Sequence, residues 1–201
     1  MIKKGPKHKV CRKAGFCLFG KSKCPSIKRP YPAGASGKKR RKMTLFGNLL
    51  WEKQKIRATY NISEKQFKSL ALTAKSMKGR TGDTLMRMCE TRMDNMVFKM
   101  GFAPTIFAAR QAVVHGHFML NGHAHNSPSA LLKPGDKIGL RRPEKSEFLK
   151  NYIKEAGFKK NYPSYVEISP DEATGTLMRF PEVDEIYKNG IPEKVIEFYS
   201  R

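Results

Sequence analysis

The sequence predicts an α+β protein, in which a basic extended N-terminal arm precedes helices and a small antiparallel sheet. Apolar residues recur at helical spacing through residues 46–113, which indicates amphipathic helices. Alternating apolar and polar residues replace that spacing at 117–120 and 138–140, beside turn-forming Asn-Gly and Pro-Gly-Asp sequences. Residues 1–42 show neither period, so we expect mostly loop with one short helical turn.

The arm holds much of the positive charge of the chain. No acidic residue precedes Glu52, whereas fifteen Lys or Arg fall between Lys3 and Lys42. Four prolines and five glycines in the same segment oppose regular structure. We therefore expect an extended arm that becomes ordered on a negatively charged partner.

The composition of the whole chain narrows the class of partner. Its 201 residues carry a net charge of +23, and self-repulsion on that scale favours a polyanion such as nucleic acid. No apolar run approaches the ~20 residues that cross a bilayer, and no signal peptide is apparent. Four cysteines are too few for a secreted disulfide framework, so we expect a reducing, intracellular compartment.

The middle of the chain is expected to form four helices. Ser63 with Gln66 forms a capping box, and Asp83 and Thr105 are the expected N-caps of later helices. Met77 is placed on the apolar face of the second helix. The expected helices span residues 46–60, 63–79, 83–101 and 105–116.

Strands are expected next. Phe118 and Leu120 alternate with polar neighbours, Asn121-Gly122 predicts a hairpin, and a second turn precedes the strand at 138–140. We expect a further helix from about Glu144. Short strands are expected at YVEI, TLMRF and KVIEFY, which are residues 165–168, 176–180 and 194–199.

Four of the five histidines lie between His115 and His125. Alternation places His117 and His125 on opposite faces of the hairpin, so they cannot easily share a metal ion. His125 falls on the face of Phe118, where a half-buried histidine with a hydrogen-bond partner is expected. His115 and His117 flank Gly116 beside Arg110 and Gln111, a group that suits phosphate and base-edge contacts. No nearby acid could polarise an imidazole for catalysis, and Asp94 is expected to pair with Arg92 or Arg110.

The cysteines allow two interpretations. His8, Cys11, Cys17 and Cys24 could form a structural zinc site in an arm with little else to hold it together. Their spacing is looser than a CxxC pair, and Cys17 could equally be a small buried side chain between Phe16 and Leu18. The sequence favours the version without a metal ion or cofactor.

Planar side chains stand among the cations, as single-stranded or junction RNA favours. The clusters are Lys28, Arg29 and Tyr31, then GKKRRK, then Lys53 to Tyr60. The residues predicted to contact RNA on these grounds are Lys3, Lys4, Lys7, Arg12, Lys13, Lys28, Arg29, Tyr31, Lys38, Lys39, Arg40, Arg41, Lys42, Lys53, Gln54, Lys55, Arg57, Tyr60, Arg110, Gln111, His115, Gly116 and His117.

Several segments resemble one known family. TRMDNMVFKMGFAPTIFAARQAVVHGHFMLNG, followed by PGDKIGLRRPEKS, resembles the RNA-binding module of the small-subunit ribosomal protein four family. RPYPAGASGKKRRK, WEKQKIRATYNISEKQF, KGRTGDTLMRMCE and VIEFYSR are similar to family segments in the expected order. The likeness covers nearly the whole chain.

The resemblance implies a domain organisation and a role. It implies an arm of residues 1–45, a helical domain of 46–91 completed by C-terminal strands from 160–201, and an inserted module of 92–159. It also implies a structural, non-enzymatic protein of the small ribosomal subunit that contributes to translational accuracy. This protein would bind a multi-helix junction in the 5′ domain of the ribosomal RNA, near the mRNA entry path. The expected neighbours include protein five, with no membrane and no homo-oligomer, in cytoplasmic or organellar ribosomes.

The resemblance also assigns residues. GKKRRK would lie toward incoming mRNA, and the RNA face of the module would be lined by Arg92, Asn95, Lys99, Arg110, Gln111, His115, His117 and Asn121. This chain departs from the family pattern at 32–37, at Leu45 and at Asn61, where glycine is common. Zinc-binding members carry cysteine where His8 stands, whereas the short arm resembles that of members without zinc.

Two other functions are compatible with such a module. An RNA-modifying enzyme would need a second domain with a buried catalytic acid, for which too few residues remain. A nonspecific binder of polyanions would bind any polyanion equally well.

Overall fold

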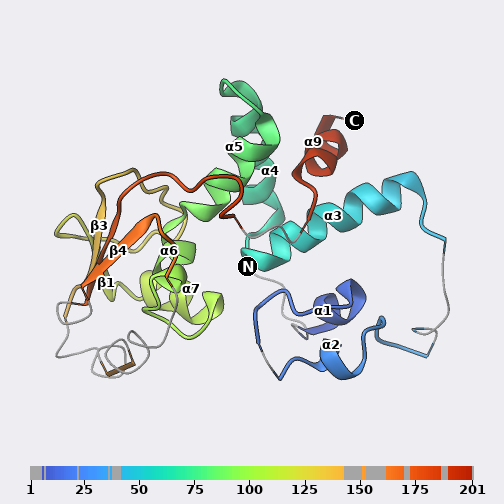
Figure 1. Ribbon diagram of the computed structural model, residues 1–201, viewed down its shortest axis with the longest axis horizontal. Helices are drawn as coiled ribbons and strands as arrows, with labels where there is room; N and C mark the ends of the chain where they lie inside the picture. The colour runs from blue at the N-terminus through green and yellow to red at the C-terminus, as the bar shows by residue number, and fades with distance from the viewer. Residues whose placement is uncertain are drawn as a thin grey trace. The chain divides into compact units, whose positions relative to one another are not determined.

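The computed structural model confirms the α+β class (Figure 1). The chain divides into two compact units, Met1–Leu85 with Tyr187–Arg201, and Met86–Ile186. The structure describes residues 6, 8–21, 23–35, 37, 42–142, 151–152, 162–169, 173–186 and 190–200.

The described part of the arm is folded, so the expectation of an extended arm is wrong for these residues. Helices α1 (His8–Ala14) and α2 (Pro25–Lys28) lie beside each other (Figure 1). Between them Cys11, Leu18 and Cys24 form a small buried cluster, against which Ala58 of the next helix packs. These apolar contacts hold together a segment that is rich in proline and glycine.

Helix α3 (Leu45–Thr59) begins where the sequence predicts, because the Thr44 hydroxyl accepts a hydrogen bond from the Gly47 N–H at 3.1 Å. Its buried residues Leu49, Lys53 and Ile56 lie on one face. Helix α9 (Pro192–Ser200) packs against α3 (Figure 1).

The strand predicted at 194–199 is wrong, because these residues belong to α9. Val195, Phe198 and Tyr199 stand at i, i+3 and i+4, so a helix places all three on one face. Val195 is fully buried, and Phe198 contacts the Phe46 ring with centroids 5.5 Å apart. Packing against α3 therefore outweighs the strand propensity of this segment.

Helix α4 (Glu64–Ser76) has the predicted cap, in which the Ser63 hydroxyl accepts from the Gln66 N–H at 3.4 Å. Phe67, Ala71 and Ala74 are buried as predicted. Met77 lies beyond the helix end and is 51% exposed, so its predicted place in the core is wrong.

The helix expected at 83–101 is two helices, α5 (Thr81–Glu90) and α6 (Met93–Lys99). Helix α5 begins at Thr81, so Asp83 lies in the first turn and is not the N-cap. The helices are separate because Arg92 forms a β-bridge with Leu131, which draws the backbone out of helical geometry. Nothing in the spacing of apolar residues indicates this interruption.

Helix α7 (Ile106–Val114) has its predicted cap, since the Thr105 hydroxyl accepts from the Ala108 N–H at 3.1 Å. It ends as predicted at Gly116, whose φ is +72°. In the next turn Asn121 and Gly122 have φ values of +50° and +81°, as a type I′ hairpin requires.

The strands are β1 (Phe118–Leu120), β2 (His123–Ala124), β3 (Lys137–Leu140), β4 (Val166–Ser169) and β5 (Thr174–Leu177). They form an antiparallel sheet in the order β2-β1-β3-β5-β4. Its buried side packs on α6 and α7, and Phe102, Phe118 and Tyr165 are among the largest side chains in that core. Strand β4 arises at the first C-terminal site expected, whereas β5 ends at Leu177 and shares only two residues with the strand expected at 176–180. Because β5 pairs with β3 and with β4, both strands extend the sheet of the second unit and lie apart from the helical domain that they were expected to complete.

The helix expected from about Glu144 lies mostly outside the described residues. Asn151 and Tyr152, which the structure describes, are helical. Among the described helices, none combines the length and the apolar character needed to cross a bilayer.

Candidate nucleic-acid interface and metal centre

The end of α7 and the start of β1 bring four of the predicted RNA contacts together. The His115 N–H donates to the Gln111 carbonyl at 3.0 Å, and Gly116 then turns the chain into β1. The rings of His115 and His117 have centroids 6.2 Å apart. Gln111 and His115 are exposed, whereas Gly116 and His117 are half-buried.

The same place contains a cation that sequence reasoning missed. The Arg141 N–H donates to the His117 carbonyl at 2.8 Å, as an extension of the pairing between β1 and β3. A Cβ built on Gly116 would stand 3.7 Å from the Arg141 guanidinium, so this exposed side chain lies beside the glycine. We name Gln111, His115, Gly116, His117 and Arg141 the α7–β1 corner. Pairing the two predicted strands in register would have found Arg141.

Arg92 and Asn95, both predicted RNA contacts, are instead buried, at 1% and 2% exposed. Arg92 donates through Nε and Nη2 to the two carboxylate oxygens of Asp94, at 3.0 and 2.9 Å. Asn95 Nδ2 donates to the Glu90 carbonyl at 2.8 Å. Both side chains therefore hold the interior together, and neither can reach RNA without unfolding its surroundings.

Arg110 and Lys99 are half-buried and also paired. Arg110 Nη1 donates to Asp94 Oδ2 at 3.1 Å, so Asp94 pairs with both predicted arginines. Burial lowers the pKa of Arg110, and the Asp94 carboxylate only partly opposes this effect. Lys99 Nζ lies 3.0 Å from Glu90 Oε1.

The residues of α3 that were predicted to contact RNA are partly or fully buried within the first unit. Lys53 is 4% exposed, and its ammonium lies 2.6 Å from Glu64 Oε1 and 4.1 Å from the centre of the Phe198 ring. Burial would raise the pKa of Glu64, but hydrogen bonds from Lys53 and Tyr199 outweigh it and lower that pKa. The other predicted contacts on this helix are half-buried or buried: Gln54, Lys55, Arg57 and Tyr60.

Two predicted contacts of the arm interact with aromatic rings of their own unit. The Arg12 guanidinium lies 5.2 Å from the centre of the Tyr31 ring, and the Lys13 ammonium lies 4.2 Å from that of Trp51. Lys28, Arg29 and Lys42 are exposed. The predicted contacts that lie outside the described residues are Lys3, Lys4, Lys7, Lys38, Lys39, Arg40 and Arg41.

Two residues of the hairpin, Asn121 and His125, differ in their hydrogen bonding. Asn121 donates from Nδ2 to Asp136 Oδ1 and accepts from the Lys137 N–H, both at 2.8 Å, so its amide fixes the hairpin against the next turn. His125 is half-buried opposite Phe118, as predicted. Its buried Nε2 finds no hydrogen-bond partner in the part of the chain that the structure describes, so the expected hydrogen bond is not made by that nitrogen.

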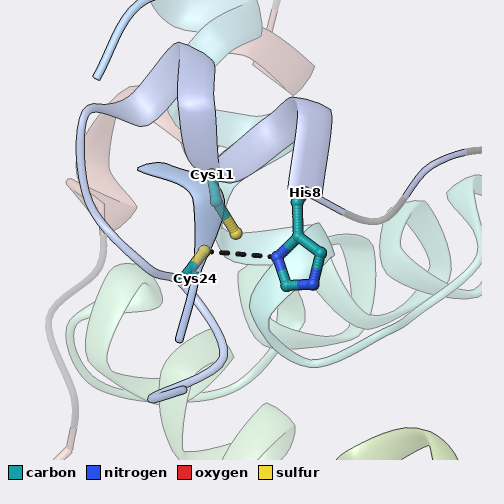
Figure 2. A group of neighbouring side chains, drawn as sticks. All are labelled: His8, Cys11 and Cys24. Atoms are coloured by element: carbon teal, nitrogen blue, oxygen red, sulfur yellow. Dashed lines mark hydrogen bonds between the residues drawn. The ribbon is translucent and has the colours of Figure 1, made fainter. Parts of the chain in front are cut away.

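His8, Cys11 and Cys24 meet in the folded arm (Figure 2). One ligand atom from each lies within 4.8 Å of the others, and His8 Nδ1 is 3.2 Å from Cys24 Sγ. His8 and Cys11 stand one turn apart on α1, and Cys24 is the N-cap residue of α2. Both cysteines are buried.

The two thiols differ in acidity. Burial opposes ionisation of Cys24, but hydrogen bonds from Ser26, Cys17 and His8 outweigh it and lower its pKa to about 6. Burial, with the neighbouring Cys24 and Cys17, raises the pKa of Cys11 to about 12. A zinc ion would offset the repulsion between the two thiolates, because its positive charge attracts both.

Comparison with known proteins identifies the family. Residues 3–90 match the family described as Ribosomal protein S4/S9 N-terminal domain, and residues 91–138 match the S4 domain. The chain is 43% identical to the small ribosomal subunit protein uS4 of Rubrobacter xylanophilus over 197 residues, and 43% identical to that of Brevibacillus brevis over 199 residues. Each comparison covers 98% of both chains. The chain belongs to the uS4 family. It is therefore a structural, non-enzymatic protein of the small ribosomal subunit that binds small-subunit rRNA.

The matched regions assign the two sites to different parts of the uS4 chain. The α7–β1 corner, apart from Arg141, lies within the S4 domain match, whereas the group of His8, Cys11 and Cys24 lies within the N-terminal match. Imidazole and thiolate are the ligand types that structural zinc prefers, and three of the four ligands of a tetrahedral site are already close together. The residues of this uS4 chain thus fit a structural zinc ion, which is the alternative that the sequence disfavours.

Proposed function

We propose that this uS4 protein is a primary rRNA-binding assembly protein that contacts a multi-helix junction of the 5′ domain. The α7–β1 corner is the observation that carries the proposal. Two imidazoles, an amide, a guanidinium and a glycine without a side chain converge there, and backbone or side-chain N–H groups of this kind bind phosphate and base edges.

The proposal includes the place of the protein in the subunit. It lies near the mRNA entry path, contacts ribosomal protein five and contributes to translational accuracy. The domain organisation that goes with it has an arm of 1–45, a helical domain that begins at 46, and a module that begins at 92 and takes in β4 and β5 from the C-terminal part of the chain. The basic run GKKRRK supports an orientation of the arm toward mRNA, since it concentrates five cations in six residues.

Binding competition tests the proposal. The full chain is first bound to a labelled 5′-domain rRNA fragment at fixed salt, and unlabelled fragment or heparin is then added as competitor. When the two competitors are compared at equal concentrations of negative charge, the rRNA fragment is expected to displace the label at a far lower concentration than heparin. Six to ten phosphate contacts would lower affinity by ~10³–10⁵ between about 50 and 200 mM salt. Equal displacement by heparin would overturn the proposal in favour of nonspecific polyanion binding.

We also propose a structural zinc ion held by His8, Cys11 and Cys24. The grouping of their ligand atoms within 4.8 Å supports it, as does the acidic thiol of Cys24. When bound, the ion supplies folding energy by joining α1 to the start of α2. Metal analysis of the purified chain tests this second function. One equivalent of zinc is expected, and a chain that is fully folded without metal would contradict it.

A further inference from the structure

Trp51 is the single tryptophan of the sequence, and it lies on α3 away from the buried face of that helix. The buried residues of α3 are Leu49, Lys53 and Ile56. The helical repeat places Trp51 on the opposite side, where its indole is half-buried. A large aromatic ring that is only partly covered is typical of a binding surface.

The ammonium of Lys13 lies over this ring. Its Nζ is 4.2 Å from the ring centre of Trp51, and α1 packs beside α3 (Figure 1). Because Lys13 is itself exposed, the face of the indole that it covers lies at the surface of the first unit. A cation on an exposed ring is held weakly, and the flexible side chain of lysine allows it to move away.

The preceding residue of α1 forms a similar pair that is fixed in place. The Arg12 guanidinium lies 5.2 Å from the centre of the Tyr31 ring, and its Nε donates to the Tyr31 carbonyl at 3.2 Å. Two successive residues of α1 thus place cations over aromatic rings. Proteins bind single-stranded RNA with such sets, in which bases stack on the rings and cations contact the phosphates.

The charge around Trp51 favours an anionic partner. The sequence contains no acidic residue before Glu52, which follows Trp51 directly. The carboxylate of Glu52 is engaged within the unit, since Oε1 lies 2.9 Å from Lys55 Nζ and Oε2 accepts from the Ile191 N–H at 3.1 Å. A nucleotide that approaches the ring is therefore attracted by the cations of α1, and Lys55 offsets the charge of Glu52.

We infer that Trp51 stacks on an unpaired base of the ribosomal RNA, while the Lys13 ammonium leaves the ring and contacts the phosphate of that nucleotide. Trp51 is not among the residues that the basic clusters or the family resemblance assign to RNA. The inference rests on the proposed function and adds to it a base contact in the first unit. Such a contact increases affinity without selecting a base, because every base has a face that can stack.

The fluorescence of the full chain tests the stacking directly, because Trp51 is its single tryptophan. A base in stacking contact quenches indole emission, whereas heparin has no aromatic group that can stack. We expect the emission to fall strongly at saturation with the 5′-domain rRNA fragment and to change little at saturation with heparin. Unchanged emission with the fragment bound, or an equal fall with heparin, would show that no base stacks on Trp51.

Substitutions separate stacking from charge. Trp51→Leu keeps an apolar side chain and removes the ring, so binding of the fragment is expected to weaken by about 5- to 100-fold. The slope of log affinity against log salt should stay at the parent value in this variant, whereas Lys13→Ala should reduce it by ~1.

Phe180→Leu is the matched control. Its ring is 43% exposed and lies 5.9 Å from the Arg87 guanidinium, but Glu182 and Asp184 follow it in the sequence. The loss of this ring should leave the affinity for RNA unchanged.

The outcomes distinguish this inference from the proposed function. If Trp51→Leu binds the fragment as tightly as the parent protein, the stacking contact is wrong, although the proposed function stands. If heparin displaces the fragment equally well while the fragment alone quenches Trp51, the proposed function is wrong and the stacking contact stands. Urea denaturation shows whether Trp51→Leu is folded, and if it is not, the emission of the parent protein decides.

Discussion

Arg92 and Asp94 form a bidentate ion pair in which the two side chains are 1% and 0% exposed. Asp94 also accepts from Arg110 Nη1 at 3.1 Å and from the Asn95 N–H at 2.9 Å. One carboxylate thus pairs with two guanidinium groups within the second unit. The loss of such a carboxylate leaves buried charge without a counter-ion.

Asp94→Asn is expected to destabilise the protein by about 3–5 kcal/mol, because both arginines then lose their counter-ion. Urea denaturation of the full chain measures this. Glu182→Gln is the control, since Glu182 is 75% exposed and its Arg179 partner is 3.7 Å away. That exposed pair should contribute less than ~1 kcal/mol. Equal stability of the two variants would contradict the assigned role of Asp94.

Lys53 is expected to contribute to the stability of the fold and not to RNA affinity. Its ammonium is buried between Glu64 and the Phe198 ring, so Lys53→Ala removes packing and a charged hydrogen bond. We expect a loss of about 1–3 kcal/mol in the free energy of unfolding. RNA affinity, measured under conditions in which the variant is folded, should stay within error of the parent value. A large fall in affinity without loss of stability would reassign Lys53 to the RNA surface.

Arg141 is expected to contact a phosphate through the proposed α7–β1 corner. Arg141→Ala should weaken binding to a 5′-domain rRNA fragment and reduce the slope of log affinity against log salt by ~1. Lys75→Ala is a control that removes one exposed cation from α4, outside the proposed set. The prediction fails if the two variants change the slope equally.

Glu185 is expected to make stability depend on pH in the acid range. Hydrogen bonds from Arg179 and Ser164 and from the Glu182 N–H lower the pKa of Glu185 to about 2. In the unfolded chain a glutamate has a pKa of about 4.3. Its stabilising contribution is therefore complete above that value and is lost as the pH falls toward 2.

Glu185→Gln isolates this contribution. The difference in unfolding free energy between the parent and the variant should shrink when denaturation is repeated at about pH 3 in place of about pH 6. A difference that stays constant, or that grows on acidification, would show that the pair with Arg179 does not lower the pKa of Glu185 in solution.

The structure confirms those predictions that depend only on residues close together in the sequence. The caps at Ser63 and Thr105 and the Asn121-Gly122 hairpin each follow from side chains and dihedral preferences within a few residues. The sequence also predicts a pairing of Asp94 with Arg92 or Arg110, and the structure shows Asp94 paired with both. The RNA-binding character of the family could be predicted from its ordered segments together with the net charge of +23.

Tertiary contacts decided what the sequence left open or predicted wrongly. Residues 194–199 form a helix because α3 offers a surface for Val195, and the helix expected at 83–101 is interrupted because Arg92 bridges to Leu131. The same holds for exposure: a lysine or arginine in a basic sequence faces solvent or the interior according to elements distant along the chain. Lys53 and Arg92 are buried, whereas Arg141 joins His117 only through pairing of β1 with β3. Composition and local spacing determine which charged and polar groups the chain contains. Packing determines which of those side chains are exposed and able to contact a partner.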